Sequence, residues 1–432
     1  MEFDKDIFEG KEAFSILKFL SDEIGPRVTG SSQEDKAAKY ILSKFDEYSK
    51  NKSSINTYSH KFYSGKEASV AKLPEGAPIH GKPMWMTKST PGEGIEGNGF
   101  YLGSVNQIDE IPLVAVQDKI VFIVFSRDFL EPEIFTDLKK LYRLKPGGVV
   151  ILSNYNSKAT RSDPFIEDQS IFAQIPTMIV PANFFSKHKD HNFSGKYILK
   201  IKGMTEEGKL NNVLFKHEGA RKETIIVCAH HDTVEYSPGA RDNASGIGIL
   251  LELASIITRS KNNYSYIFLT IGGEEQGLDG VWKFIENNNL SDVILCLNID
   301  GVESLPGFVA SIVAGDEDLF KIVKEISQIN EYPALTINNT PNSGDNMAFA
   351  HEGIPSIMHM FKGSTDAGIN HTALDTSEGL DEEPLKLLGQ YLVKLINRLE
   401  LMAEVEFSVS IPLKLEEQTV NYFKRLELYN EH

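Results

Sequence analysis

The sequence predicts an α/β protein: a three-layer αβα sandwich around a mostly parallel mixed sheet, with a β-rich domain inserted into it. Two observations lead to this fold class. In the second half of the chain, short apolar runs of strand length alternate with longer segments of helical length and spacing. Before them lies a Gly/Pro-rich stretch with several short β-like runs and a different texture. The pattern therefore favours one discontinuous α/β domain and a second, β-rich domain.

Length, composition and charge are those of a soluble globular protein. At 432 residues the chain is long enough for more than one domain, and its hydrophobic fraction is 41%. A net charge of −17 disfavours nucleic acid or an anionic membrane as a partner. The start, MEFDKDIFEG, lacks a signal-peptide pattern, and no apolar run has the length of a membrane span. We therefore expect a cytoplasmic protein without membrane attachment.

The first element is a helix that follows the loop GPRVTG. Ser31 and Glu34 have the spacing of a capping box, in which each side chain bonds the backbone N–H of the other residue. Apolar residues then recur at helical spacing, at Ala38, Ile41, Leu42 and Phe45. A strand, INTYSHKFY, comes next.

The β-rich domain is expected to span 64–195, with strands in KIVFIVF, GGVVILSN and IPTMIV and a helix in DLKKLYRLK. The α/β domain would then comprise 1–63 and 196–402. Its expected strands include KYILKIKG, NNVLFKHE, TIIVCA, YSYIFLTI, DVILCLNI and IPSIMHM, and its helices IGILLELASII, DGVWKFIEN and EPLKLLGQYLVKLINRLEL. Residues 403–432 form a C-terminal extension with a strand pattern in EVEFSVSI and a possible short helix. Cys228 and Cys296 lie in apolar runs, which predicts buried thiols rather than a disulfide.

Polar side chains follow each predicted strand of the α/β domain. In an open α/β sheet, ligands bind outside the carboxyl ends of the strands. The candidate site residues at these ends are His230, His231, Asp232, Asp242, Glu274, Glu275, Asp300, His371, Thr372 and Asp375. Carboxylates gathered so closely would repel each other without a cation. Mixed His and Asp/Glu ligands suit zinc, with cobalt or manganese as alternatives.

The alternation of side chains along a strand sharpens the first motif. His230 and Asp232 would share one face, so that Asp232 can orient His230 as metal-bound histidines require. His231 would point to the other face and pack there. The adjacent pair Glu274 and Glu275 is explained if one binds metal and the other stays free as a base.

The succession AHHDTV, GARDNASG, GGEEQGLDG, LNIDG and HTALDT resembles the co-catalytic zinc peptidase family of aminopeptidase S, aminopeptidase Y and glutamate carboxypeptidase. The resemblance covers roughly 10–63 and 196–402. It implies a zinc-exopeptidase type of fold and two zinc ions per chain. The β-rich insert is similar to the protease-associated domain that several members carry at this point.

The resemblance also implies a role for each site residue. One zinc ion would be held by His230 and Asp300, the other by Glu275 and His371, with Asp242 bridging both. Glu274 would be the general acid/base that activates a water shared by the metals, and Asp232 would support His230.

Some positions depart from the family pattern or lie outside the ligand set. Asn370 stands where many members have a tyrosine, and Ser343 where several have an arginine, so the substrate-facing wall differs. Asp345 matches a family aspartate that lines the pocket or supports a loop. We expect Asp375 to contact a ligand rather than a metal, and His351 and His359 to be structural.

The leading hypothesis is an aminopeptidase acting on peptides with a free amino terminus. GGEEQGLDG, LNIDG and GINHTALDT contain no basic residue, and only Arg241 or Lys362 could turn inward to hold a substrate carboxylate. A carboxypeptidase or dipeptidase of the glutamate carboxypeptidase type is the alternative. A single-metal acyltransferase of the glutaminyl cyclase kind and a non-catalytic scaffold on the same fold are further readings. The oligomeric state stays open.

Overall fold

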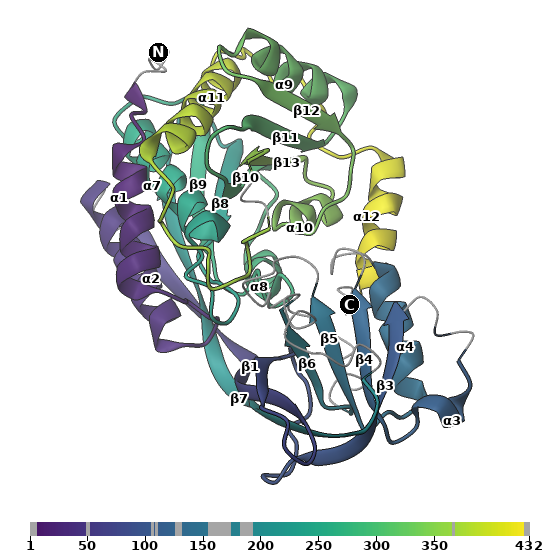
Figure 1. The fold of residues 1–432 in the computed structure, drawn as a ribbon. Helices are drawn as coiled ribbons and strands as arrows, with labels where there is room; N and C mark the ends of the chain where they lie inside the picture. The colour runs from purple at the N-terminus through teal and green to yellow at the C-terminus, as the bar shows by residue number, and fades with distance from the viewer. Residues whose placement is uncertain are drawn as a thin grey trace. The chain divides into compact units, whose positions relative to one another are not determined.

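The computed structural model describes residues 7–48, 52–104, 108, 111–125, 132–153, 174–181, 193–364 and 368–426. The chain forms two compact units. The first consists of Met1–His60, Gly208–Asn370 and Asp375–Lys424, and the second of Lys61–Glu207 with the short segments His371–Leu374 and Arg425–His432. Strands β1 (Ser53–Lys72) and β7 (Lys196–His217) have residues in both units (Figure 1). The unit boundaries fall inside these two strands, whereas the sequence placed the ends of the insert at 64 and 195.

The first unit is built on a mixed sheet, which confirms the predicted α/β class. After β7, its strands lie in the order β9 (Ser265–Ile271), β8 (Thr224–His230), β10 (Val293–Val302), β13 (Ser356–Lys362), β11 (Phe308–Ala314) and β12 (Ala334–Asn338). Four neighbouring pairs are parallel: β8–β9, β8–β10, β10–β13 and β11–β12. The pairs β7–β9 and β11–β13 are antiparallel. The parallel strands β8, β9 and β10 thus end at one edge of the sheet.

Helices cover both faces of this sheet (Figure 1). The helices of this unit are α1 (Lys11–Lys18), α2 (Ser32–Tyr48), α7 (Ser245–Ile257), α8 (Asp279–Asn287), α9 (Glu317–Ile329), α10 (Asn346–His351), α11 (Glu382–Glu400) and α12 (Leu413–Leu426). Every residue of α7 is buried, since it packs on β8 and β10 and is itself covered by α1, α2 and α11. This position explains why α7 is mostly apolar, and its one carboxylate, Glu252, accepts the backbone N–H groups of Glu9, Gly10 and Ala13. On the other face, α10 contacts α8 as well as β10 and β13.

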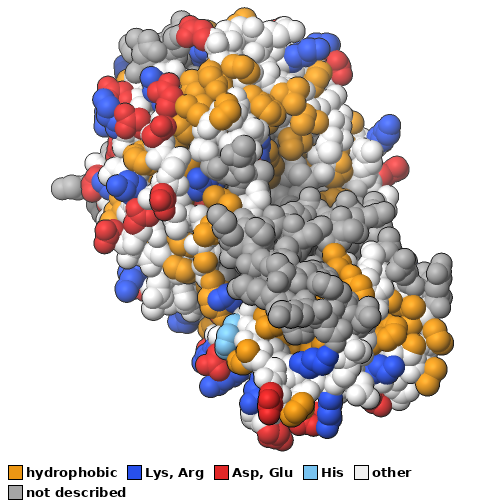
Figure 2. Space-filling view, viewed as in Figure 1, with side chains coloured by type: hydrophobic (Ala, Val, Ile, Leu, Met, Phe, Trp, Pro, Cys, Tyr) orange, Lys and Arg blue, Asp and Glu red, His pale blue; other side chains and the backbone are white. Residues whose placement is uncertain are grey.

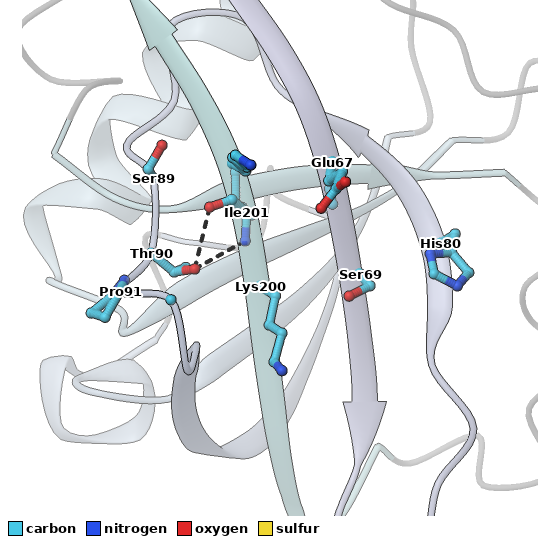
Figure 3. A pocket seen from close by; sticks show the side chains of 11 residues that line it. Glu67, Ser69, His80, Ser89, Thr90, Pro91, Lys200 and Ile201 are labelled. Atoms are coloured by element: carbon cyan, nitrogen blue, oxygen red, sulfur yellow. Dashed lines mark hydrogen bonds between the residues drawn. The ribbon is translucent and has the colours of Figure 1, made fainter.

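The second unit has its own sheet, in which β2 (Ile79–Pro83), β6 (Thr177–Val180), β5 (Gly148–Ser153), β4 (Ile120–Phe125) and β3 (Ile95–Ser104) are neighbours in that order. The strands predicted in KIVFIVF, GGVVILSN and IPTMIV are β4, β5 and β6. The predicted helix is α4 (Pro132–Arg143), and a short helix, α3 (Leu113–Val116), precedes β4. A cavity of about 710 Å³ is lined by β1, β2, β7 and the segment 89–92 (Figure 3). The similarity of this unit to a protease-associated domain stays a prediction.

Three local expectations were wrong. The runs KYILKIKG and NNVLFKHE belong to one continuous strand, β7. EVEFSVSI forms no strand in the structure, although a helix, α12, does follow it. The Ser31 hydroxyl accepts the Glu34 N–H at 3.2 Å as predicted, but the buried Glu34 carboxylate instead accepts the backbone N–H and side-chain amide of Asn211. The reciprocal half of the capping box is lost because this carboxylate is satisfied inside the protein.

The expectation of buried thiols without a disulfide is confirmed. Cys228 and Cys296 are free, buried thiols whose sulfur atoms lie 3.5 Å apart. Among the described residues, no helix combines the length and apolar character needed to cross a bilayer. On the face drawn in Figure 2, lysine and arginine side chains are scattered among aspartates and glutamates.

His359 gives the folded protein a defined pH dependence. It is fully buried on β13, with its Nδ1 2.9 Å from the Ser311 hydroxyl, and burial lowers its pKa to about 3 from an ordinary value of 6.5. Between these values the unfolded chain binds a proton here that the folded protein does not, so the free energy of unfolding falls as pH decreases. The loss is at most about 1.4 kcal/mol per pH unit.

We predict that His359→Gln flattens this part of the profile. Chemical denaturation between pH 6.5 and pH 4 should show a weaker loss of unfolding free energy than in the wild type. His80→Gln, at an exposed histidine of the second unit, is the matched control and should follow the wild-type profile. Parallel profiles for all three proteins would contradict the prediction.

Candidate metal centre

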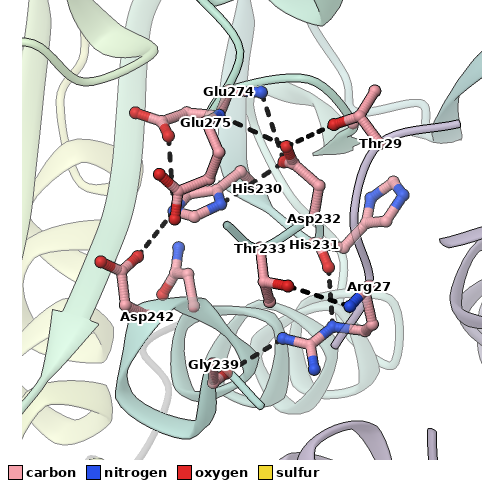
Figure 4. Close-up of polar contacts among 12 residues, drawn as sticks. Arg27, Thr29, His230, His231, Asp232, Thr233, Gly239, Asp242, Glu274 and Glu275 are labelled. Carbon is pink, nitrogen blue, oxygen red and sulfur yellow. Dashed lines mark hydrogen bonds and ion pairs between the residues drawn. The ribbon is translucent and has the colours of Figure 1, made fainter. Parts of the chain in front are cut away.

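The predicted site residues lie where adjacent parallel strands end. β8 ends at His230, which pairs with Ile271 at the end of β9, and Glu274 and Glu275 follow directly (Figure 4). Asp300 lies near the end of β10, on the other side of β8. Three strands that are remote in sequence therefore deliver their polar ends to one edge of the sheet.

The buried imidazole of His230 is surrounded by carboxylates. Its Nε2 lies 3.1 Å from Asp242, 3.6 Å from Asp300 and 4.0 Å from Glu274. Potential ligand atoms lie within 4.8 Å of one another in three groups: His230, Glu274 and Glu275; His230, Asp242 and Asp300; Asp242, Glu275 and His371. All the metal ligands that the sequence predicted are members of these groups, and Asp242 belongs to two of them.

The electrostatics of this cluster call for a cation. Burial alone would lower the pKa of His230, but the carboxylates around it, Glu274 foremost, hold that pKa well above its ordinary value. The carboxylates thus favour positive charge on the ring, and they would favour a bound divalent cation for the same reason. Burial raises the pKa of Glu274 well above its usual range, and the neighbouring charge of Glu275 adds to this. One imidazole with several carboxylate oxygens is a donor set that fits zinc.

Asp232 joins β8 to the turn that carries the two glutamates. Its carboxylate accepts the Thr29 hydroxyl at 2.7 Å and the backbone N–H groups of Glu274 and Glu275 at 3.2 and 3.3 Å. It also faces His230, as strand alternation predicted, but the 3.6 Å to His230 Nδ1 is long for a hydrogen bond. Asp232 therefore positions both glutamates in addition to facing the histidine.

A second histidine, which the sequence did not single out, holds the same turn. His60 in β1 lies with its Nε2 2.5 Å from the side-chain oxygen of Gln276 and its Nδ1 2.7 Å from the Asp279 carboxylate. The turn closes on itself through the bond from the Asp279 N–H to the Gly273 carbonyl, at 3.0 Å. No local pattern marks His60, because its partners lie more than 200 residues away in the sequence.

Asp242 lies in the short segment η4 (Ala240–Ala244), which leads into α7 and in which the backbone of Asp242 itself is not helical. Asp375 accepts the backbone N–H of Arg241 at 2.9 Å and that of Asp242 at 3.2 Å, so it contacts the chain at a candidate ligand. The guanidinium of Arg241 donates to the Thr376 carbonyl at 2.8 Å. Asp375 thus holds the backbone of Arg241 and Asp242, and the carbonyl of Thr376 holds the side chain of Arg241.

The remaining candidates lie apart from the cluster or in supporting roles. His231 points to the other face, is fully buried and lies 3.2 Å from Glu34, which confirms a packed histidine. His351 meets the ring of Trp282 edge-on at 5.3 Å, so it is structural, as His359 is. Asp345 is fully buried with neither carboxylate oxygen hydrogen-bonded, and burial raises its pKa well above the usual range. Ser343, Asn370 and His371 are half-buried, while Thr372 and Asp375 are buried.

The comparisons with known proteins agree with this site. A sequence profile described as peptidase family M28 matches residues 212–396. Aminopeptidase YwaD of Bacillus subtilis is 23% identical over 402 residues, which cover 88% of this chain and 83% of that protein.

Solved structures share the fold. BSAP, a zinc aminopeptidase from Bacillus subtilis, aligns with a TM-score of 0.74 and 19% identity over 94% of this chain and 98% of its own. A peptidase M28 precursor from Shewanella amazonensis aligns with a TM-score of 0.80 and 17% identity over 94% of this chain and 97% of its own.

The matched segment, 212–396, contains every residue of the three candidate ligand groups. The co-catalytic zinc aminopeptidases that the sequence motifs resemble are thus similar to this chain in fold as well. Residues 212–396 match the profile of peptidase family M28, and the chain is a metallo-exopeptidase.

Proposed function

We propose that this protein is a di-zinc aminopeptidase that hydrolyses the amino-terminal peptide bond of its substrates. The observation that carries the proposal is the convergence of Asp242, Glu274 and Asp300 on the buried Nε2 of His230. Divalent cations would offset the repulsion among so many carboxylates. In a peptidase such cations activate water and polarise the scissile carbonyl.

We propose the following ligand sets: His230 and Asp300 for one ion, Glu275 and His371 for the other, and Asp242 for both. Asp242 shares one group with His230 and Asp300 and another with Glu275 and His371, and this supports its bridging role. Cobalt or manganese would suit the same oxygen and nitrogen donors. The single-metal acyltransferase reading needs fewer ligands than are gathered here, and the scaffold reading predicts missing ligands.

Zinc bound by these residues would polarise the scissile carbonyl and make a neighbouring water more acidic. Glu274 would accept the proton of that water and return it to the departing amine. Burial and the neighbouring charge of Glu275 raise the pKa of the Glu274 carboxyl above the usual range, which is the direction that a general acid/base needs. Asp232 holds the backbone N–H groups of Glu274 and Glu275 and so fixes the base relative to its ligand neighbour. Glu274 would then transfer the proton, and Glu275 would bind the metal.

The surroundings of the site favour a substrate ammonium group over a carboxylate. The two basic residues that could have turned inward are already engaged: Arg241 with Thr376 and Asp375, and Lys362 with Glu303 at 3.7 Å. A terminal carboxylate would meet only like charge from Glu274 and Asp300. The carboxypeptidase alternative needs a basic residue at this place, and the described motif loops offer none that is not already engaged.

The first prediction concerns the end of the substrate that is recognised. Four matched peptides of one sequence, with a free or acetylated amino terminus and a free or amidated carboxyl terminus, are compared by initial rate. Acetylation should nearly abolish cleavage, because it removes the ammonium group, and amidation should change the rate little. Equal or faster cleavage of acetylated peptides with a free carboxylate would overturn the aminopeptidase proposal in favour of a carboxypeptidase.

The second prediction concerns metal content. The wild type should bind two divalent ions per chain, and Asp242→Ala should lower the occupancy of both, because both ions lose a ligand. Elemental analysis of the dialysed proteins measures this. Asp381→Ala, at the exposed N-cap of α11, is the control and should keep both ions. An Asp242→Ala protein that kept one site full would refute the bridging role.

The third prediction separates two neighbouring glutamates. Glu274→Gln should retain both ions and lose about 10²–10⁴-fold in kcat, since only proton transfer is removed. Glu275→Gln should bind one ion more weakly. Metal content and kcat are measured on both proteins, each serving as the control for the other. If the two variants matched in metal content and in residual activity, these roles would be wrong.

A further inference from the structure

Arg27 is a fully buried arginine in the loop between the helical segment Phe19–Ile24 and α2. Its guanidinium donates to five backbone carbonyl oxygens: Leu20 at 3.0 Å, Gly25 at 3.0 Å, His231 at 2.8 Å, Pro238 at 2.7 Å and Gly239 at 2.9 Å. Arginine carries five N–H donors in a rigid plane, so this environment uses nearly all that the side chain can offer.

Three of these carbonyls belong to the loop that connects two candidate ligands. His231 directly follows His230, and Gly239 directly precedes the turn η4 that carries Asp242 (Figure 4). Arg27 therefore contacts both ends of the loop 231–239. The backbone of Arg27 reinforces this, because its N–H donates to the Thr233 hydroxyl at 2.9 Å and its carbonyl accepts the Thr233 N–H at 3.3 Å.

The charge of Arg27 bears on the same centre. Burial lowers its pKa to about 10, so the side chain stays protonated at neutral pH, and the carboxylates of Asp375, Asp232, Asp242 and Glu275 favour the charged form. A buried charge whose hydrogen bonds all go to neutral carbonyls is costly unless nearby opposite charge compensates it. The carboxylate cluster at the sheet edge supplies that compensation.

We infer that Arg27 is a positioning residue of the metal centre: by fixing both ends of the loop 231–239, its guanidinium sets the separation of His230 and Asp242. The inference rests on the proposed function, in which these two residues are ligands. A lysine at this position would keep the charge, but its three donors could not hold five carbonyls from separate segments.

The test is zinc affinity measured by calorimetric titration of the metal-free proteins, together with hydrogen exchange of the amides of 231–242. Arg27→Met should weaken zinc binding by about 10–100-fold, the range seen when the partners of metal ligands are removed. Arg27→Lys should fall between it and the wild type. In both variants, exchange in the loop should be faster.

Two further variants keep the test decisive. Thr233→Val removes only the hydroxyl that accepts the Arg27 N–H, and it should weaken zinc binding less, in the same direction, even if the Arg27 variants fail to fold. Glu400→Gln is the matched control: this buried carboxylate accepts the Asn263 N–H and the Tyr266 hydroxyl, both at 2.6 Å, near the start of β9 at the opposite edge of the sheet. It should lower Tm without changing zinc affinity.

The outcomes distinguish this inference from the proposed function. Wild-type zinc affinity and loop exchange in the Arg27 and Thr233 variants, alongside a lowered Tm like that of Glu400→Gln, would overturn the inference. A wild type that binds no divalent ion would instead refute the proposed function. In that case the amide hydrogen exchange of loop 231–239 in Arg27→Lys still tests the positioning role. Exchange as slow as in the wild type would overturn that role, and faster exchange would show that Arg27 holds the loop in place.

Discussion

Mutual repulsion among closely grouped, half-buried carboxylates is the constraint on which the organisation of the first unit depends. Asp242, Glu274 and Asp300 come from three different segments and meet around the imidazole of His230. Groups of like charge do not gather of their own accord, so each must be held from behind by the chain that carries it. A cation can offset the repulsion only after the fold has brought these carboxylates close together. The edge of the sheet where β8, β9 and β10 end brings them together.

The supporting contacts share one design, since they act on the backbone beside His230, Asp242 and the Glu274–Glu275 pair. Asp232 accepts the N–H groups of Glu274 and Glu275, and Asp375 accepts that of Asp242. Arg27 donates to carbonyls of the loop after His230. Support of this kind, from partners outside the ligand set, is what orients the ligands at metal sites.

Much of this arrangement could be predicted from the sequence, because the strands of the α/β domain are continuous apolar runs and a polar motif follows each end. TIIVCA, YSYIFLTI and DVILCLNI became β8, β9 and β10, and the carboxyl ends of parallel strands necessarily meet. The supporting residues could not be predicted in the same way. Arg27 and His60 bond partners about 200 residues away, and nothing local distinguishes them from surface residues. Glu34 fitted a helix-capping pattern, yet tertiary burial gave its carboxylate other partners.

The discontinuity of the first unit has a consequence for the order of events during synthesis. The segment that contains Arg27 leaves the ribosome before the whole of Lys61–Glu207, and its partner loop at 231–239 follows only after that. At typical elongation rates this gap lasts roughly 10–40 s. During that interval most of the second unit is synthesised, and the nascent N-terminal segment, with the apolar faces of α1 and α2, has no α7 to cover. The candidate metal centre is therefore assembled late, and the first 60 residues must stay able to dock until the strands and α7 that they contact have been made.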